Sequence, residues 1–403
     1  MSTLTPTSMK LSLFIADARV RAGMLCIVFG LGAALILPAL RRSADAAPIS
    51  DPAASLPLPE GGVQSDAFSL RLLQAEMERN TDSTLTAPLA TAALLHHLED
   101  LAEPGCAAEL QLPEQLPNTN PFPRVFCGLF AEASLPFAMP PTQAGVVAVD
   151  FSGTASTAMH MMAQSVQKAT GISPELSIGP GSLLGEAPQL VAFMATSVPG
   201  PTTSFSADCI KHLPFANTNG MQPEVPTMQG SIPARLARAE DGSWLALALP
   251  LQPQPGAEGE PLFFCAILPR GSARDFAQQL TPQQLSSIRA ALARTPQSLT
   301  DISLPAIRTI STPRNTTLPP MPGLAALTAP GALRRLSPKP LALSSLLICN
   351  SFSPASPPAP EQASAAPLTH SSPDADFSRP FLWFVGDLTS PAPPFLFGII
   401  ENL

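Results

Sequence analysis

The chain has 403 residues and a net charge of −8, with 45% hydrophobic and 13% charged side chains. This composition is too apolar for a disordered chain and allows a sizeable folded core. The acidic balance excludes the basic surface that nucleic-acid binding requires, so no nucleic-acid partner is expected. Proline is unusually frequent: the 49 prolines are about 12% of the chain, against roughly 5% in an average protein, which predicts few long helices and central strands.

An uncharged apolar run near the N-terminus, residues 23–40, is long enough to span a bilayer. Basic residues flank it on both sides, so the positive-inside rule gives no orientation. The small-residue sequence Ala44-Asp45-Ala46 follows, which signal peptidase could accept. We therefore expect residues 1–46 to be a signal peptide or a membrane anchor. The protein is then secreted, or anchored in the secretory pathway with only residues 23–40 in the membrane.

The residue types on which most enzymes and metal sites depend are few and scattered. The sequence contains no HExxH, GxSxG or phosphate-binding glycine motif, and its six cysteines include no CxxC pair. His96 and Asp100 could share one face of a helix, but nothing in the sequence supplies the other ligands of a metal. We expect no enzymatic activity, no metal and no cofactor.

Residues 47–64 are small, polar and proline-bearing, and predict a linker. Apolar spacing and cap residues then predict helices over 66–78, 88–98, 155–168 and 282–294. Short apolar runs predict strands over 145–151, 189–198, 244–251 and 262–268. Helices first and strands later, without an internal repeat, favour an α+β domain over residues 65–403.

A series of short motifs runs through this region in a fixed order. They are LTAPLA (85–90), VDF (149–151), VPTM (225–228), LTP (280–282), and RPFL (379–382) with FLFG (395–398). Each motif is weak by itself, but the collinear series over residues 66–403 resembles the serpin superfamily, as a divergent member.

The resemblance implies an α+β domain with three β-sheets, surrounding helices and an exposed reactive loop. A serine protease attacks this loop as though it were a substrate. In inhibitory members the cleaved loop then inserts into the central sheet and carries the acylated protease with it. The implied partner is an extracellular serine protease, and the protein is expected to be a monomer.

Counting back from Pro380 without a gap places the reactive loop at about 353–379 and its scissile bond between Thr369 and His370. The hinge that must insert then contains Ser353, Ala355, Pro357, Pro358 and Pro360. Proline has no N–H for a sheet ladder, so these prolines oppose insertion. A gapped alternative makes 361–366 the hinge, but it leaves a very short bait segment.

Three further positions differ from the family. Ala87, Ala90 and Met194 occupy the shutter beneath the insertion site, where serpins use hydroxyl and amide groups. The hydrogen-bonded gate is thus expected to be apolar. Together with the hinge prolines, this predicts that protease trapping is impaired or lost.

The functional alternatives differ in class. Serine-type endopeptidase inhibition is the commonest family activity, and Leu368 or Thr369 would then direct the loop to elastase- or chymotrypsin-like enzymes. The hinge prolines instead favour a non-inhibitory serpin-fold carrier, chaperone or partner-binding protein. A third alternative is an anchored, proline-rich surface protein without a stable serpin core.

Overall fold

The computed structural model describes residues 65–104, 108–113, 124–174, 184, 188–205, 207–252, 261–307, 314–352, 363–369, 372–390 and 392–403. These residues all belong to one unit of the chain, Pro52–Leu403. Among them, no helix is both long and apolar enough to cross a bilayer. The N-terminal segment and the linker expected at 47–64 lie outside the described residues, so they stay predictions.

The first helices and the helix after Thr281 form where the sequence predicts them. They are α2 (Ser65–Arg79), α3 (Pro88–Leu101) and α7 (Pro282–Arg294). At α7 the Thr281 hydroxyl accepts a hydrogen bond from the Gln284 N–H at 3.2 Å. The Gln284 side chain in turn accepts one from the Thr281 N–H at 2.9 Å. This capping box satisfies two N–H groups that the helix itself cannot, which explains why the local sequence predicts the start of α7 so well.

Helix α4 (Phe151–Thr170) begins earlier than the predicted 155. Asp150 is its N-cap, with a carboxylate oxygen that accepts a hydrogen bond from the Gly153 N–H at 2.7 Å. The helix ends at Gly171, whose φ of 75° is the left-handed conformation that glycine adopts without strain. The preceding strand is correspondingly shorter than predicted, because the chain turns at Asp150.

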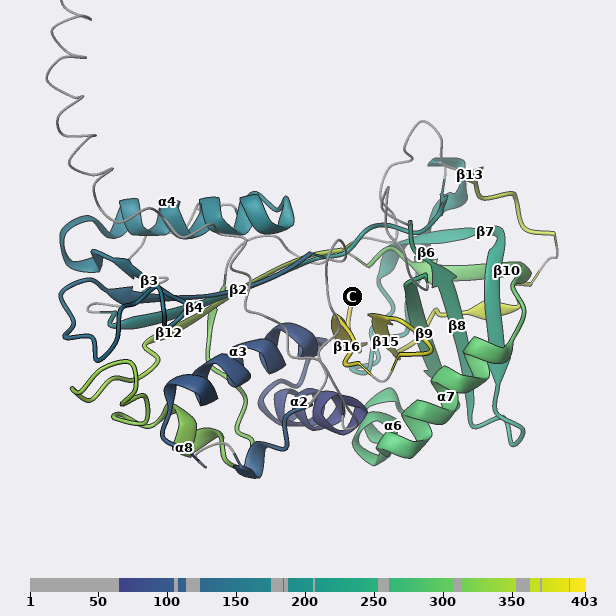
Figure 1. The fold of residues 1–403 in the computed structure, drawn as a ribbon. Coiled ribbons are helices and arrows are strands. Elements are labelled where there is room, and N and C mark those ends of the chain that lie inside the picture. Colours follow the sequence, from purple (N-terminus) through teal and green to yellow (C-terminus); the bar gives the residue numbers. More distant parts are fainter. Residues whose placement is uncertain are drawn as a thin grey trace, which may run out of the picture. The chain divides into compact units, whose positions relative to one another are not determined.

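A five-stranded sheet forms one layer, with α4 on one face and α3 on the other (Figure 1). Its strand order is β11-β12-β4-β2-β3. The strands are β2 (Arg124–Glu132), β3 (Val146–Val149), β4 (Leu190–Ser197), β11 (Arg314–Thr316) and β12 (Ser345–Ser351). The strand predicted over 189–198 is thus confirmed as β4, at the centre of the sheet.

Both faces of β4 are buried. Leu190, Ala192 and Met194 join the core on the α3 side, and the alternating Val191, Phe193 and Ala195 join the core under α4. A strand covered on both faces has no polar side to show in its sequence. This explains the continuous apolar run from which the strand was predicted.

A nine-stranded sheet forms the second layer, in the order β1-β16-β15-β9-β8-β7-β10-β14 with β6 beside β7. Its strands are β1 (Thr84–Thr86), β6 (Ile210–Pro214), β7 (Glu224–Arg238), β8 (Trp244–Pro250), β9 (Phe263–Pro269), β10 (Ser298–Pro305), β14 (Ala375–Asp376), β15 (Phe381–Gly386) and β16 (Leu396–Ile400). The long strand β7 pairs with β8 through one end and with β10 and β6 through the other. The predicted α+β class, with several sheets and surrounding helices, is confirmed.

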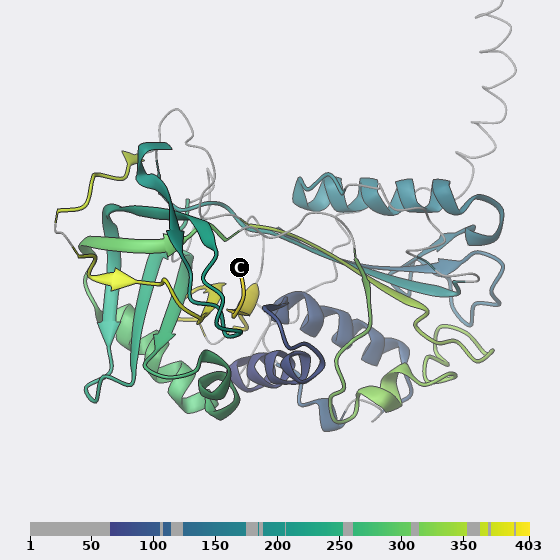
Figure 2. The ribbon, with the colours of Figure 1, turned by 180° about the vertical axis from the view of Figure 1, so that it is seen from behind.

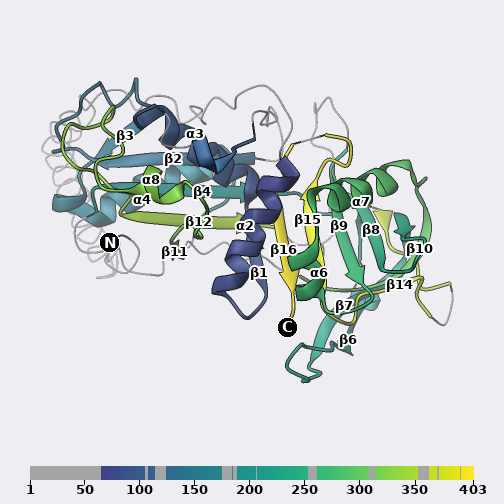
Figure 3. The same cartoon turned by 90° about the horizontal axis from the view of Figure 1, so that it is seen from below.

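Three helices cover one face of β8, β9, β15 and β16: α2, α6 (Ala273–Gln279) and α7 (Figure 3). Their apolar side chains form one core with these strands. Arg274 of α6 ties the layer to the C-terminus, because it donates to both carboxylate oxygens of buried Glu401 and to the carbonyls of Met77 and Asn80.

His97 of α3 is a buried titratable group that faces the turn before β3. Its Nε2 lies 2.6 Å from the Ala144 carbonyl and therefore carries the proton, while Nδ1 has no hydrogen-bond partner in the part of the chain that the structure describes. Burial lowers the pKa of His97 below its ordinary value of 6.5, against smaller opposite effects of the Ala144 carbonyl and of Asp100. The imidazole is thus held neutral in the folded state.

This burial predicts a loss of stability in mild acid. The unfolded chain binds a proton at His97 more readily than the folded chain, so stability is lost as the pH falls below 6.5, by up to about 1.4 kcal/mol per pH unit. In His97→Gln the amide keeps a donor to Ala144 and does not titrate. Thermal midpoints measured from pH 7.5 to 5 should therefore fall less in the variant than in the wild type. Parallel pH profiles would show that His97 does not carry the effect.

Candidate functional site

An aromatic cluster lies where the predicted reactive loop begins. Phe352, the residue after β12, is 3% exposed and stacks between two rings from other strands. Its ring centroid lies 5.4 Å from Phe264 of β9 and 5.8 Å from Trp383 of β15. Sequence analysis missed Phe352, although it is the last apolar side chain before a proline-rich stretch. The cluster fixes the point at which the chain leaves the sheet.

Two parts of the predicted loop are described, residues 363–369 and 372–379, and the first of them is paired with the body of the protein. Its first two residues form β13 (Ala363–Ser364), which pairs in parallel with β5 (Thr203–Ser204). Ala366 then exchanges two backbone hydrogen bonds with Ser231 of β7, at 2.8 and 3.1 Å. Figures 1 and 2 show the segment beside the strands from both sides.

The end of this segment is bound by a buried carboxylate. Asp301 of β10 is 1% exposed, and its Oδ2 accepts hydrogen bonds from the Thr369 N–H at 2.9 Å and the Thr369 hydroxyl at 2.7 Å. The predicted scissile position thus has an exposed side chain but an anchored backbone. Sequence analysis also missed Asp301, whose only signal is that it is the single acidic residue in a strand of apolar and hydroxyl residues. His370 lies outside the described residues, as do the hinge residues Ser353, Ala355, Pro357, Pro358 and Pro360.

We call the paired strands β4 and β12 the seam. They run parallel, with partners from Ser345 opposite Val191 to Ser351 opposite Ser197. The three predicted shutter residues are all buried: Met194 belongs to the central strand β4 of the five-stranded sheet, and Ala87 and Ala90 lie at the start of α3 on one face of it. Ala87 is the N-cap of α3 and makes no side-chain hydrogen bond there. The side chains of these three residues are apolar, and their role as a shutter stays a prediction.

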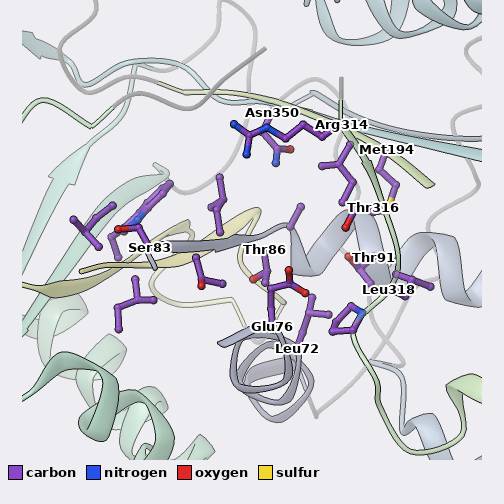
Figure 4. Close-up of a pocket in the computed structure, with 18 of the residues that line it drawn as sticks. Leu72, Glu76, Ser83, Thr86, Thr91, Met194, Arg314, Thr316, Leu318 and Asn350 are labelled. Atoms are coloured by element: carbon purple, nitrogen blue, oxygen red, sulfur yellow. The ribbon is translucent and has the colours of Figure 1, made fainter. Parts of the chain in front are cut away.

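A cavity of about 460 Å³ lies under the seam, and we call it the seam cavity. It is bounded by α2, β1, α3, β4, β11, β12, β15 and β16. Figure 4 shows Arg314 and Asn350 on one side, Glu76 on the opposite side, and Met194 and Thr316 at one end. The structure brings Ala87 and Met194 together in its lining, whereas Ala90 lies in the core beside it.

Other reactive groups do not assemble. His96 Nε2 lies 2.8 Å from the Pro113 carbonyl, and among the described residues no cluster of His, Cys, Asp and Glu could hold a metal ion. The side chains of Cys127, Cys265 and Cys349 are buried. Burial raises the pKa of Cys349 to about 12 and also raises those of Cys127 and Cys265, so these thiols are poor nucleophiles.

The chain is similar to known proteins in its fold, but its sequence matches none of them closely. No family model matches the chain, and no curated protein matches it. Three solved structures cover most of it at low identity. The native thermophilic serpin tengpin is 16% identical, with a TM-score of 0.62 over 86% of this chain and 96% of that one. Native protease nexin-1 with heparin is 16% identical, with a TM-score of 0.63 over 84% and 98%. Uncleaved ovalbumin is 15% identical, with a TM-score of 0.61 over 83% and 100%.

The chain has the serpin fold. The resemblance read from the collinear motifs is therefore confirmed at the level of the fold.

The serpin fold indicates which contacts the loop of this chain would have to break in order to insert into the five-stranded sheet. If the cleaved loop of this chain enters the five-stranded sheet beside β12, it must separate the seven residue pairs of the seam. It must also leave β5, Ser231 and Asp301, which hold residues 363–369 on the other sheet. These contacts define the candidate site as the loop segment, its anchors and the seam.

Proposed function

We propose that this protein is a serpin-fold binding protein of the secretory pathway, secreted or membrane-anchored, whose covalent trapping of proteases is impaired or lost. The observation that carries the proposal is where the loop is anchored. Contacts with β10 hold residues 374–377, after the predicted scissile bond between Thr369 and His370, but a separate set of contacts holds residues 363–369, which precede that bond. This is the part of the loop that must travel if trapping is to occur.

The strength of the anchors supports slow or failed insertion. The two hydrogen bonds at Ala366 contribute about 0.5–1.5 kcal/mol each, and the two to the Asp301 carboxylate about 1.5–3 kcal/mol each. The hinge prolines add a second obstacle, because an inserted strand lacks their N–H donors. Deacylation of the protease competes with insertion, so a delayed loop is cleaved as an ordinary substrate.

The competing function is inhibition of an extracellular elastase- or chymotrypsin-like serine protease. Incubation of the full chain with chymotrypsin or pancreatic elastase separates the two. We expect cleavage near Thr369 and no SDS-resistant covalent adduct. An adduct with either protease would overturn the proposal.

The same assay tests the anchor. In Asp301→Asn the two bonds to Thr369 lose their charged acceptor, so the segment opens more often and cleavage should be about tenfold faster. The matched control is Asp376→Asn, an exposed residue of β14 whose carboxylate accepts hydrogen bonds from the N–H and the hydroxyl of Ser378, two residues along the chain. Equal cleavage rates in both variants would show that Asp301 does not restrain the loop.

The secretory destination rests on the apolar run at 23–40 and the small residues that follow it. Mass spectrometry of the protein from expressing eukaryotic cells identifies its mature N-terminus. We expect a chain that begins near residue 47 in the medium, or an intact chain in the membrane fraction. A full-length chain in the cytosol would contradict this part of the proposal.

A further inference from the structure

The seam cavity has the size of a ligand site. Its volume of about 460 Å³ falls within the roughly 300–1,000 Å³ of small-molecule pockets. None of the described residues that line it belongs to the reactive loop at 353–379, whereas the seam forms one of its walls. The cavity therefore borders the candidate site on the side away from the described loop segment.

The wall against the seam is apolar. Met194 of β4 and Leu346 of β12 are at most 2% exposed and face the cavity from the sheet, and Leu72 and Ala87 face it from α2 and the start of α3. Ala87 contributes only a methyl group, at a position where a longer side chain would project into the space. These surfaces fit the hydrocarbon body of a ligand and give it little to hydrogen-bond with.

The charge at the cavity is unbalanced. Arg314 of the edge strand β11 is exposed and lines the cavity beside Asn350 (Figure 4). Its backbone belongs to the ladder with Ile348 of β12, but its guanidinium makes no hydrogen bond or ion pair with any described residue. Glu76 faces it from the opposite side, but that carboxylate is already paired with Arg79 at 3.2 Å and accepts from the Asn80 amide at 2.8 Å. The guanidinium of Arg314 is thus available to attract the anionic group of a ligand.

We propose that the seam cavity binds an elongated apolar monocarboxylate of the fatty-acid type. Its hydrocarbon body lies against Met194, Leu346 and Ala87, and its carboxylate pairs with Arg314. A guanidinium suits this role because its planar fork matches the two oxygens of a carboxylate. This inference goes beyond the proposed function, since it assigns a ligand to a cavity that no described residue of the loop lines.

Trp383 provides the measurement. It lines the cavity, and the chain has only one other tryptophan, Trp244 at the start of β8. In Trp244→Phe all indole fluorescence comes from Trp383. Titration with decanoate, below its micellar concentration, should change this emission along a saturable curve. A change that only rises linearly with decanoate would overturn the proposal.

The charge contact is tested by Arg314→Gln in the same background. An exposed ion pair of this kind is worth about a two- to fivefold change in affinity, so decanoate should bind that much more weakly. Decan-1-ol, which has the same body without the charge, should bind equally to both proteins. The matched control is Arg270→Gln, an exposed arginine that does not line the cavity. Unchanged decanoate affinity in Arg314→Gln, or an equal loss in Arg270→Gln, would refute the assigned contact.

The position of the hydrocarbon body is tested by filling the cavity. Thr316 lies on edge strand β11 and is half-buried, so Thr316→Phe places a ring in the cavity without opening the main core. Binding of both decanoate and decan-1-ol should be lost while the thermal midpoint is kept. If this variant does not fold, Ala306→Leu at another half-buried wall position serves the same purpose. Full binding in a folded filled variant would place the ligand elsewhere and overturn the proposal.

A covalent protease adduct, in contrast, would overturn only the proposed function.

Discussion

Replacement of Arg289 by methionine is expected to lower the free energy of unfolding by about 3–5 kcal/mol. Arg289 of α7 is 7% exposed, and its guanidinium joins three parts of the fold. It donates to the Asp66 carboxylate of α2 at 2.7 Å, to the Asp387 carbonyl at 2.7 Å and to the Ser390 carbonyl. Methionine fills much of the same volume but donates nothing, so all three acceptors lose their partner. Equilibrium urea unfolding, followed by circular dichroism, measures the difference.

The matched control lies in the same helix. Arg294→Met replaces an exposed arginine and should change the free energy of unfolding by no more than about 0.5 kcal/mol. Burial raises the pKa of Asp66 even though Arg289 lowers it, so loss of Arg289 leaves an ionised carboxylate in a poorly solvated place. The deficit of Arg289→Met should therefore shrink as the pH is lowered and Asp66 takes up a proton. A deficit equal to that of Arg294→Met, or one independent of pH, would show that Arg289 does not hold these elements together.

The helices could be predicted because their signals are local. The cap at Thr281 and the glycine at 171 act within a few residues of the helix ends, whereas the cap at Asp150 was missed and the start of α4 was placed four residues too late. Strand β4 could also be predicted from the sequence, because burial on both faces leaves a continuous apolar run. In each case, residues close together in the sequence determine the helix or strand, and tertiary contacts stabilise it.

The long strand β7 shows why other elements could not be predicted. It extends over fifteen residues and contains Pro226, Gly230 and Pro233, residues that normally argue against a central strand. Its partners change along its length, so no single alternation of polar and apolar residues marks it. The sequence analysis found only the motif VPTM (225–228) in this region and predicted no strand there.

The candidate site depends even more on distant contacts. Asp301 and Thr369 are 68 residues apart, and neither position carries a motif that links them. The seam cavity likewise combines helix, strand and C-terminal residues from the whole domain. Sequence reasoning could place the loop by counting, but the contacts that hold it require the folded structure.

Replacement of Pro357, Pro358 and Pro360 by alanine is expected to restore insertion of the cleaved loop. Each proline denies an inserted strand one N–H donor, at a cost of about 1–3 kcal/mol. After a nick near Thr369, the thermal midpoint of the wild type should stay close to that of the intact chain. The nicked triple variant should melt roughly 5–10 °C higher than the nicked wild type, because the added strand then stabilises the five-stranded sheet. Differential scanning calorimetry before and after mapped limited proteolysis measures both changes.

The control replaces three prolines outside the loop. Pro330, Pro338 and Pro340 are exposed and precede β12, so their alanine variant should respond to the nick as the wild type does. A large rise in the nicked wild type would mean that the loop inserts despite its prolines, and would favour the inhibitor. No rise in the triple variant would move the obstacle from the hinge to the anchors at Ser231 and Asp301 or to the apolar shutter. The triple variant combined with Asp301→Asn then distinguishes the anchors from the shutter. If the anchors are the obstacle, the loop inserts once Asp301 has lost its charge; if the shutter is the obstacle, it does not.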